Sequence, residues 1–215
     1  WENMEDNITP FAKEVLERYD LVVCGNDDCE RIVRPYTKAT VILPQVGVDT
    51  DHFQARNTPR NIAVAYIGRH VKEKGIEKLM LAWPMARVLP WKPYLELPWW
   101  YSMCKVVVCY SQDTKFWREQ APPYVAVEAL CCGCAVVASD AGSIPFWSRR
   151  FNDTPNLGIS LVPQGSILEL KEQIEITLLN KMNQTTNSIE LGRKWVEENL
   201  SSRVIARRLT DVLSV

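Results

Sequence analysis

Short apolar runs alternate with amphipathic stretches along most of the chain. Each run has the length and the β-branched content of a buried strand. We expect strands at Leu21–Asn26, Ala39–Leu43, Ile62–Ile67, Lys105–Cys109, Ala135–Ser139 and Leu157–Val162. Helical spacing predicts helices at Pro10–Arg18, Asp27–Arg34, Ile76–Arg87, Glu96–Met103, Tyr124–Cys132, Ile167–Asn180, Ser188–Asn199 and Ser201–Leu213. Strands separated by helices indicate an α/β fold, a doubly wound parallel sheet with both faces covered.

Residues that start or end helices support these bounds. Thr9 stands before Pro10 as an N-cap, and Ser201 stands in the same way before the last helix. Gly133 follows the segment with Glu128 and can take the left-handed conformation that ends a helix. Each of these three positions therefore predicts a helix boundary.

Composition excludes several classes of protein. The 215 residues are 47% apolar with a formal net charge of −1, so no general attraction to nucleic acid or anionic lipid is expected. No apolar run approaches the roughly 20 residues of a spanning helix. Seven scattered cysteines fit a reducing, cytoplasmic setting better than a disulfide framework. The CCGC cluster has the wrong spacing for a zinc site, so no metal is expected.

A charged turn follows the strand Ile62–Ile67. Its sequence, GRHVKEKG, runs from Gly68 to Gly75 and places Arg69 and Lys74 near the start of a helix. Backbone N–H groups and the helix dipole favour an anion at such a place. The alternative is a turn whose charges only face solvent.

A second segment, Gln120 to Pro145, places Glu128 on a helix before the strand Ala135–Ser139 and the loop Ala141–Ser143. In doubly wound sheets, ligands bind outside the carboxyl ends of the strands. A carboxylate there can accept hydrogen bonds from sugar hydroxyls. Alternatively, Glu128 only complements the helix dipole.

Five segments in this order resemble the C-terminal, donor-binding half of GT-B glycosyltransferases, specifically the retaining family 4. They are VILPQVGVDTDHF, YIGRHVKEKGIEKLMLAW, LPWWYSMCKVVVCYS, the segment with Glu128, and RKWVEENLSSRVIARRL. The resemblance covers most of residues 20 to 213 and implies a Rossmann-like sheet. It divides the chain into the end of an acceptor domain with a linker (1–54), a donor-binding domain (55–187) and terminal helices that pack back (188–215). Because the chain begins with Trp1, we expect a fragment or a processed product.

The resemblance implies a role for each site residue. Gly68 lets the backbone approach the diphosphate of a UDP- or GDP-sugar, and Arg69 and Lys74 neutralise this diphosphate as it leaves, without a metal or other cofactor. Glu128 accepts hydrogen bonds from the ribose. The remaining donor-binding positions are Tyr124, Val125, Gly142 and Ser143. The acceptor would be a glycan or a lipid-linked sugar, and no nucleic acid is involved.

The chain departs from the family pattern in the loop before Glu128. The family has a second glutamate eight positions earlier, where this chain has Gln120, with Glu119 beside it. Either Glu119 serves as the catalytic carboxylate or Gln120 replaces it. The family also has a Phe-Gly turn, where Pro122 and Pro123 lack the N–H groups to donate.

The chain also looks shortened. With a helix that reaches Arg87, only about ten residues remain before Pro98, where the family inserts a strand, a helix and a strand. These departures leave alternatives open: a degenerate partner subunit that binds a nucleotide sugar or acts as a scaffold, or a sugar-nucleotide epimerase. The aromatic stretch Trp91–Tyr101 suggests a core or partner-subunit contact, or a peripheral contact with the cytoplasmic membrane face.

Overall fold

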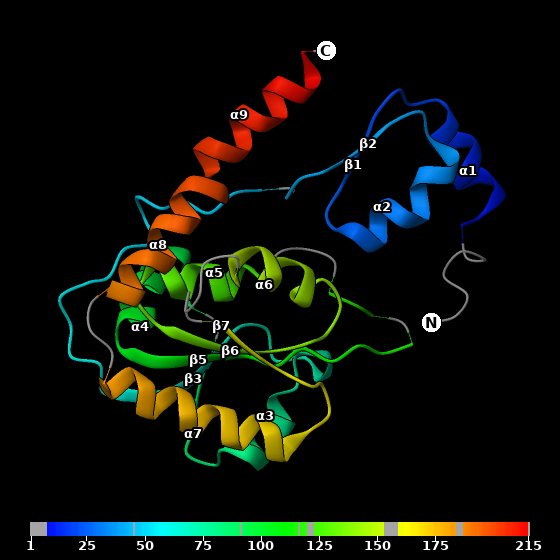
Figure 1. Cartoon of the computed structure of the whole chain (residues 1–215). Coiled ribbons are helices and arrows are strands. Elements are labelled where there is room, and N and C mark those ends of the chain that lie inside the picture. Colours follow the sequence, from blue (N-terminus) through cyan, green and yellow to red (C-terminus); the bar gives the residue numbers. More distant parts are fainter. Residues whose placement is uncertain are drawn as a thin grey trace.

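The computed structural model of the chain describes residues 8–44, 46–90, 92–115, 117–119, 123–152, 159–183 and 187–214. Five parallel strands form the main sheet in the order β4-β3-β5-β6-β7 (Figure 1). Their bounds are β3 Ile62–Ile67, β4 Arg87–Leu89, β5 Cys104–Cys109, β6 Ala135–Ser139 and β7 Ile159–Val162. The α/β fold class that the sequence predicts is confirmed.

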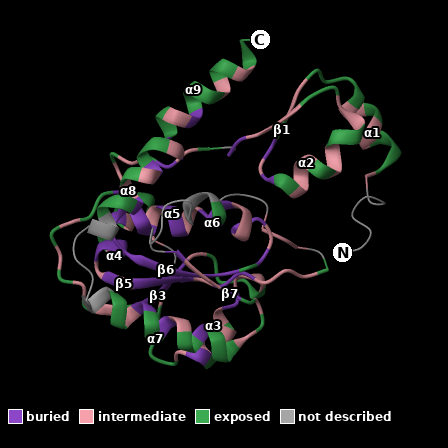
Figure 2. Ribbon diagram, viewed as in Figure 1, coloured by how far each residue is buried: buried purple, intermediate pink, exposed green. Residues whose placement is uncertain are grey.

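Helices cover both faces of this sheet, and the strands are the buried centre of the domain (Figure 2). One core lies against α4 (Leu97–Ser102), α5 (Tyr124–Cys131), α6 (Ile144–Asn152) and α8 (Asn187–Asn199). The other lies against α3 (Ile76–Ala82) and α7 (Ile167–Asn183). Because the strands are buried on both faces, they are continuous apolar runs rather than alternating ones.

The N-terminal part has a small sheet of its own, which we call the N-terminal unit (residues 9–43). Strands β1 (Val22–Cys24) and β2 (Thr40–Ile42) pair in parallel, and α1 (Pro10–Glu17) and α2 (Asp27–Val33) accompany them. The side chain of Thr9 accepts a hydrogen bond from Ala12 N at 3.2 Å, which confirms the predicted N-cap. A short 3-10 helix, η2 (Arg34–Tyr36), follows α2.

The end of the chain returns to the linker that follows β2. Val48 forms a parallel bridge with Ser201, and Val48 N donates to Leu200 O at 2.8 Å. Ser201 caps α9 (Ser202–Leu213) by accepting from Val204 N, as predicted. Helix α9 extends from this bridge away from the main sheet (Figure 1). No helix in the described ranges is long and apolar enough to span a membrane.

The predicted helix Ile76–Arg87 is wrong beyond Ala82. Trp83 leaves the helical region with φ −140° and ψ 82°, because it precedes Pro84, which disfavours helical geometry at the residue before it. Arg87–Leu89 then forms β4, which pairs with β3 at one edge of the sheet. The segment before Pro98 therefore contains one strand, which the sequence prediction assigns in part to the end of the helix.

Other expected bounds differ little. The predicted helix Glu96–Met103 begins instead as the 3-10 helix η4 (Tyr94–Glu96) and continues as α4.

Helix α6 is absent from the sequence prediction. Of the predicted strand Leu157–Val162, the first two residues lie outside the described residues. Gly133 has φ 77°, the left-handed conformation expected at the end of α5.

Gly75 is the position where a side chain is excluded most clearly. It ends the 3-10 helix η3 (Lys72–Lys74) with φ 64°, and an added Cβ would lie 2.1 Å from the carbonyl oxygen of Tyr110. We expect Gly75→Ala to lower the free energy of unfolding by about 3 kcal/mol. The matched control is Gly165→Ala, where φ is also positive (90°) but the nearest atom, Lys78 Nζ, is 3.7 Å away. Urea unfolding measures both, and equal losses would contradict a steric role for Gly75.

Candidate active site

A cavity of about 260 Å³ lies at the carboxyl ends of β3 and β5. In the sheet, β4 lies on one side of β3 and β5 lies on the other. The strand order therefore reverses between β3 and β5, where the cavity lies. Doubly wound sheets bind their ligands at such a switch point. The predicted site residues that line the cavity are Gly68, Arg69, Lys74, Glu119, Tyr124 and Val125.

The turn after β3 forms one wall. Gly68 has φ 153°, and an added Cβ would lie 3.1 Å from the hydroxyl oxygen of Tyr66. That hydroxyl donates a hydrogen bond to the carbonyl oxygen of Arg69, which fixes the turn. Arg69 is exposed and has no ion-pair partner among the described residues. Its guanidinium is therefore available to an anion in the cavity.

Lys74 reaches the cavity from the next turn and is not free. Its ammonium group lies 2.5 Å from Glu119 Oε2, and the two side chains are 22% and 17% exposed. Ser111 Oγ donates to the same carboxylate oxygen at 3.1 Å. The ammonium group also lies 4.9 Å from the centre of the Trp117 ring, within range of a cation–π contact. Within the part of the chain that the structure describes, Lys74 is thus paired, whereas Arg69 has no ion-pair partner.

Glu128 lies deeper on α5, one turn after Tyr124 and Val125, and is not among the residues that line the cavity. Its carboxylate accepts a hydrogen bond of 2.7 Å from the buried hydroxyl of Tyr101. Desolvation raises the pKa of Glu128 to about 7, and the hydrogen bond from Tyr101 opposes this rise. Near neutral pH, the group is therefore partly protonated.

Gly142 and Ser143 support Glu119 and are not among the residues that line the cavity. Ser143 N donates to Glu119 O at 2.8 Å. Gly142 has φ 52°, and an added Cβ would lie 2.3 Å from the same carbonyl oxygen. The loop Ala141–Ser143 therefore packs on the segment that carries Glu119.

Gln120 and Pro122 lie outside the described residues, so their predicted effects remain predictions. Pro123 is described, lines the cavity and precedes α5 as its N-cap residue. Its carbonyl oxygen accepts hydrogen bonds from Ala126 N and Val127 N, and its ring nitrogen has no hydrogen to donate.

The sequence did not point to several residues that complete the cavity. They are Tyr66, Ile67, Val108, Cys109, Tyr110, Ser111 and Ile144. Most of them belong to β3, β5 or the residue that follows each strand. The signal was available, because the last residues of adjacent parallel strands meet at one edge of the sheet.

Chemically, this cavity suits an anion with two charged groups. A phosphate group can contact the exposed guanidinium of Arg69 and the turn at Gly68. Arg offers a fork of donors that matches phosphate oxygens, and Lys offers a point charge. Fixed cations at this position can stabilise negative charge that develops on a leaving phosphate.

Several solved structures share the fold of this chain. Sucrose-phosphate synthase from Thermosynechococcus elongatus superimposes with a TM-score of 0.74 at 22% identity, over 94% of this chain and 59% of that one. Anabaena HepE in complex with UDP gives 0.77 at 15% identity, over 98% of this chain and 68% of that one. The C-terminal domain of LpcC, a glycosyl transferase group 1 family protein from Francisella tularensis, gives a TM-score of 0.53 at 19% identity. The match covers 70% of this chain and 97% of that one.

These likenesses confirm the predicted GT-B type of α/β fold. The chain spans about three fifths of the synthase and about two thirds of HepE. No protein-family model matches the sequence. No curated protein matches it either.

Proposed function

We propose that the chain binds a nucleoside diphosphate sugar and is a glycosyltransferase, or the donor-binding part of one. The observation that carries this proposal is the meeting of Arg69, Lys74 and the Gly68 turn at one cavity, at the switch point of the sheet. A surface turn with solvated charges would not need a cavity walled by two strands and α5.

The donor would lie with its diphosphate against Arg69 and the Gly68 turn. Its ribose would extend along α5 past Tyr124 and Val125 toward Glu128, where a carboxyl group that is half protonated near pH 7 can accept or donate a hydrogen bond. The two cations would stabilise the leaving diphosphate in place of a metal ion. HepE has been solved with UDP and with UDP-glucose, which favours a UDP-sugar over a GDP-sugar.

The proposed reaction retains the configuration of the sugar. The bond between the sugar C1 and the phosphate oxygen breaks, and the acceptor hydroxyl oxygen forms a bond to C1 from the same face. The leaving phosphate takes the proton of that hydroxyl. Glu119 would face the sugar once the diphosphate has taken its place at Lys74. The acceptor would be a glycan or a lipid-linked sugar, and the site would be cytoplasmic.

A thermal-shift panel tests whether a nucleotide binds. We expect UDP and UDP-glucose, each at 100 times its Kd, to raise the free energy of unfolding by about 2.7 kcal/mol through binding to the native state alone. GDP and ADP should give smaller shifts at equal concentrations. A melting temperature that no nucleotide changes would contradict the proposal. Release of glucose from UDP-glucose then separates an enzyme from a binding protein.

One observation favours the second candidate, a degenerate transferase-like partner subunit. Pro123 stands in the cavity wall, where a residue with an N–H group could donate to the donor. A partner subunit would bind UDP-glucose without turning it over. Calorimetry shows the binding, and the assay for released glucose shows the absent turnover.

A further inference from the structure

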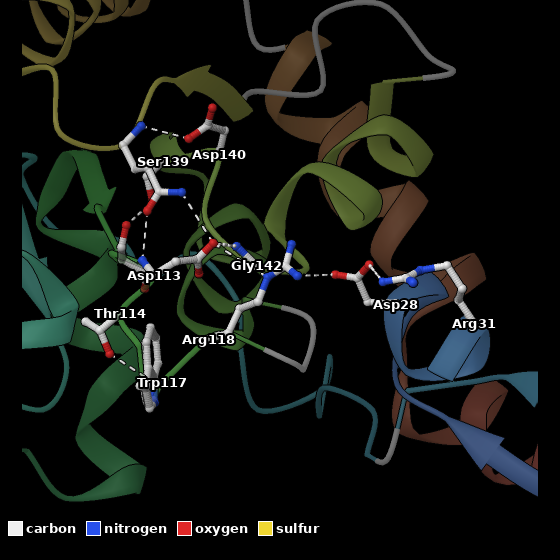
Figure 3. Close-up of polar contacts among 11 residues, drawn as sticks. Asp28, Arg31, Asp113, Thr114, Trp117, Arg118, Ser139, Asp140 and Gly142 are labelled. Carbon is white, nitrogen blue, oxygen red and sulfur yellow. Dashed lines mark hydrogen bonds and ion pairs between the residues drawn. The ribbon is translucent and has the colours of Figure 1, made fainter. Parts of the chain in front are cut away.

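The loop that follows β5 touches both the cavity and the N-terminal unit. We call residues 111–115 and 117–119 the clasp loop. Figure 3 shows Arg118 between Asp113, on the same loop, and Asp28, on α2 of the N-terminal unit. Glu119 is the next residue and pairs with Lys74 in the cavity. Two adjacent residues of the loop therefore contact two different parts of the fold.

The clasp loop is well anchored on the side of the main sheet. Asp113 Oδ2 accepts hydrogen bonds from Gly142 N at 3.1 Å and from Gln164 Nε2 at 3.3 Å. Asp113 N in turn donates to Gln164 Oε1 at 2.8 Å. Arg118 Nε lies 3.5 Å from the same Asp113 oxygen. The Nε atom of Arg118 is thus linked through Asp113 to the loops at the edge of the main sheet.

The other end of Arg118 is tied to the N-terminal unit. Its Nη1 lies 2.6 Å from Asp28 Oδ2, and the two side chains are 24% and 27% exposed. Asp28 also pairs with Arg31, one turn along α2, at 3.6 Å. Partial burial strengthens the ion pair between Arg118 and Asp28, because solvent and salt screen partly buried charges less than exposed ones.

Side-chain direction links this ion pair to the cavity. Trp117 and Glu119 both contact Lys74, whereas Arg118, between them, points to Asp28 and Asp113. Neighbouring side chains of this segment therefore have different partners. A movement of Arg118 therefore shifts Glu119, its covalent neighbour, relative to Lys74.

We propose that Arg118 is a positioning residue that, by holding Asp28 and Asp113, keeps Glu119 on Lys74 and so limits the positive charge that the cavity offers to a diphosphate. A diphosphate and Glu119 compete for the same ammonium group. When the N-terminal unit releases Arg118, Glu119 is held less firmly and Lys74 becomes available. The inference rests on the proposed function only for the identity of the ligand.

The first test compares Arg118→Ala with Arg31→Ala by calorimetry with UDP. Arg31 pairs with the same Asp28 but not with the clasp-loop residue Asp113, so it is the matched control. We expect Arg118→Ala to bind UDP about threefold more tightly, the scale of a partly exposed ion pair, and Arg31→Ala to bind it like the unaltered chain. Asp28→Asn should act in the same direction as Arg118→Ala. Unchanged or weaker binding by Arg118→Ala would overturn the inference.

A double variant isolates the route through Glu119. Glu119→Gln alone should bind UDP more tightly, because it removes the charge that competes for Lys74. Adding Arg118→Ala to Glu119→Gln should then change the affinity by less than about 1.5-fold, because the two substitutions act on one ion pair. A full threefold change in that background would mean that Arg118 acts in some other way, and would reject the role.

A second readout does not depend on UDP. The rate at which an amine-specific reagent modifies Lys74, followed by mass spectrometry, reports how often its ammonium group leaves Glu119. We expect a rate about threefold higher in Arg118→Ala and an unchanged rate in Arg31→Ala. If no variant binds UDP, the proposed function fails and these labelling rates alone decide the role of Arg118. Equal rates in all variants would reject it.

Discussion

Arg69→Ala is expected to lower the rate of sugar transfer about 100-fold or more with little effect on folding. The leaving diphosphate gains negative charge as its bond to the sugar breaks, and removal of one fixed donor of this kind typically costs about 10²- to 10³-fold in kcat. Arg69 is exposed and has no ion-pair partner in the described part of the chain, so its loss leaves no buried charge. Release of sugar from UDP-glucose under single-turnover conditions measures the effect.

Lys74→Ala should cause a loss of similar size, although it also leaves Glu119 without its cation. Lys72→Ala is the matched control, since Lys72 belongs to the same 3-10 helix but is exposed and is not among the residues that line the cavity. Thermal unfolding should show that Arg69→Ala and Lys72→Ala are folded alike. Full turnover by both Arg69→Ala and Lys74→Ala would show that these two cations do not serve the leaving group.

Glu128 should make the stability of the protein fall as the pH rises from about 4.5 to about 7. Its pKa is raised from 4.5 to about 7 by burial, so in this window the folded chain keeps a proton that the unfolded chain has lost. The free energy of unfolding then decreases with pH, by about 3 kcal/mol for this group at the scale of 1.4 kcal/mol per pKa unit. The loss from Glu128 is complete about one pH unit above its pKa of about 7, where the folded chain has also lost this proton.

Glu128→Gln tests this dependence, because glutamine keeps the size of the side chain and a partner for Tyr101 but does not ionise. We expect the variant to be more stable than the unaltered chain at pH 8 and close to it at pH 4.5, as measured by urea unfolding. Glu190→Gln, at an exposed position of α8, is the control. The same pH dependence in the unaltered chain and in Glu128→Gln would show that Glu128 ionises without penalty.

The main sheet could be predicted because its strands are buried on both faces. A strand with an apolar side chain at nearly every position, such as Ala135–Ser139, is found at those bounds. Helix caps were equally predictable, since the hydroxyl groups of Thr9 and Ser201 contact N–H groups three residues later. These features depend on residues that are close in sequence.

The edge strand β4 was missed for a physical reason. Arg87–Leu89 is only three residues long, and Arg87 is exposed. The apolar spacing around it continues that of α3, and only Pro84 marks the break. Helix α6 was also missed, although its sequence has a clearer signal than that of β4. Ile144 and Trp147 are three residues apart, the spacing of one helical face, and the structure shows both side chains buried.

The two cations of the site could be predicted from the turn after β3, but the ion pair could not. Lys74 and Glu119 are 45 positions apart, and their contact depends on the path of the clasp loop. Arg118 and Asp28 are still farther apart in the sequence, and their ion pair joins the clasp loop to the N-terminal unit. Pairings of this kind depend on tertiary geometry, which a single sequence does not reveal.

A crystal structure of the chain with UDP tests the central claim most directly. We expect the diphosphate in the cavity between β3 and β5, with its oxygens against the Arg69 guanidinium and the Gly68 turn, and with Glu119 moved off Lys74. The account is contradicted if millimolar UDP leaves this cavity empty, or if the nucleotide binds on another part of the chain.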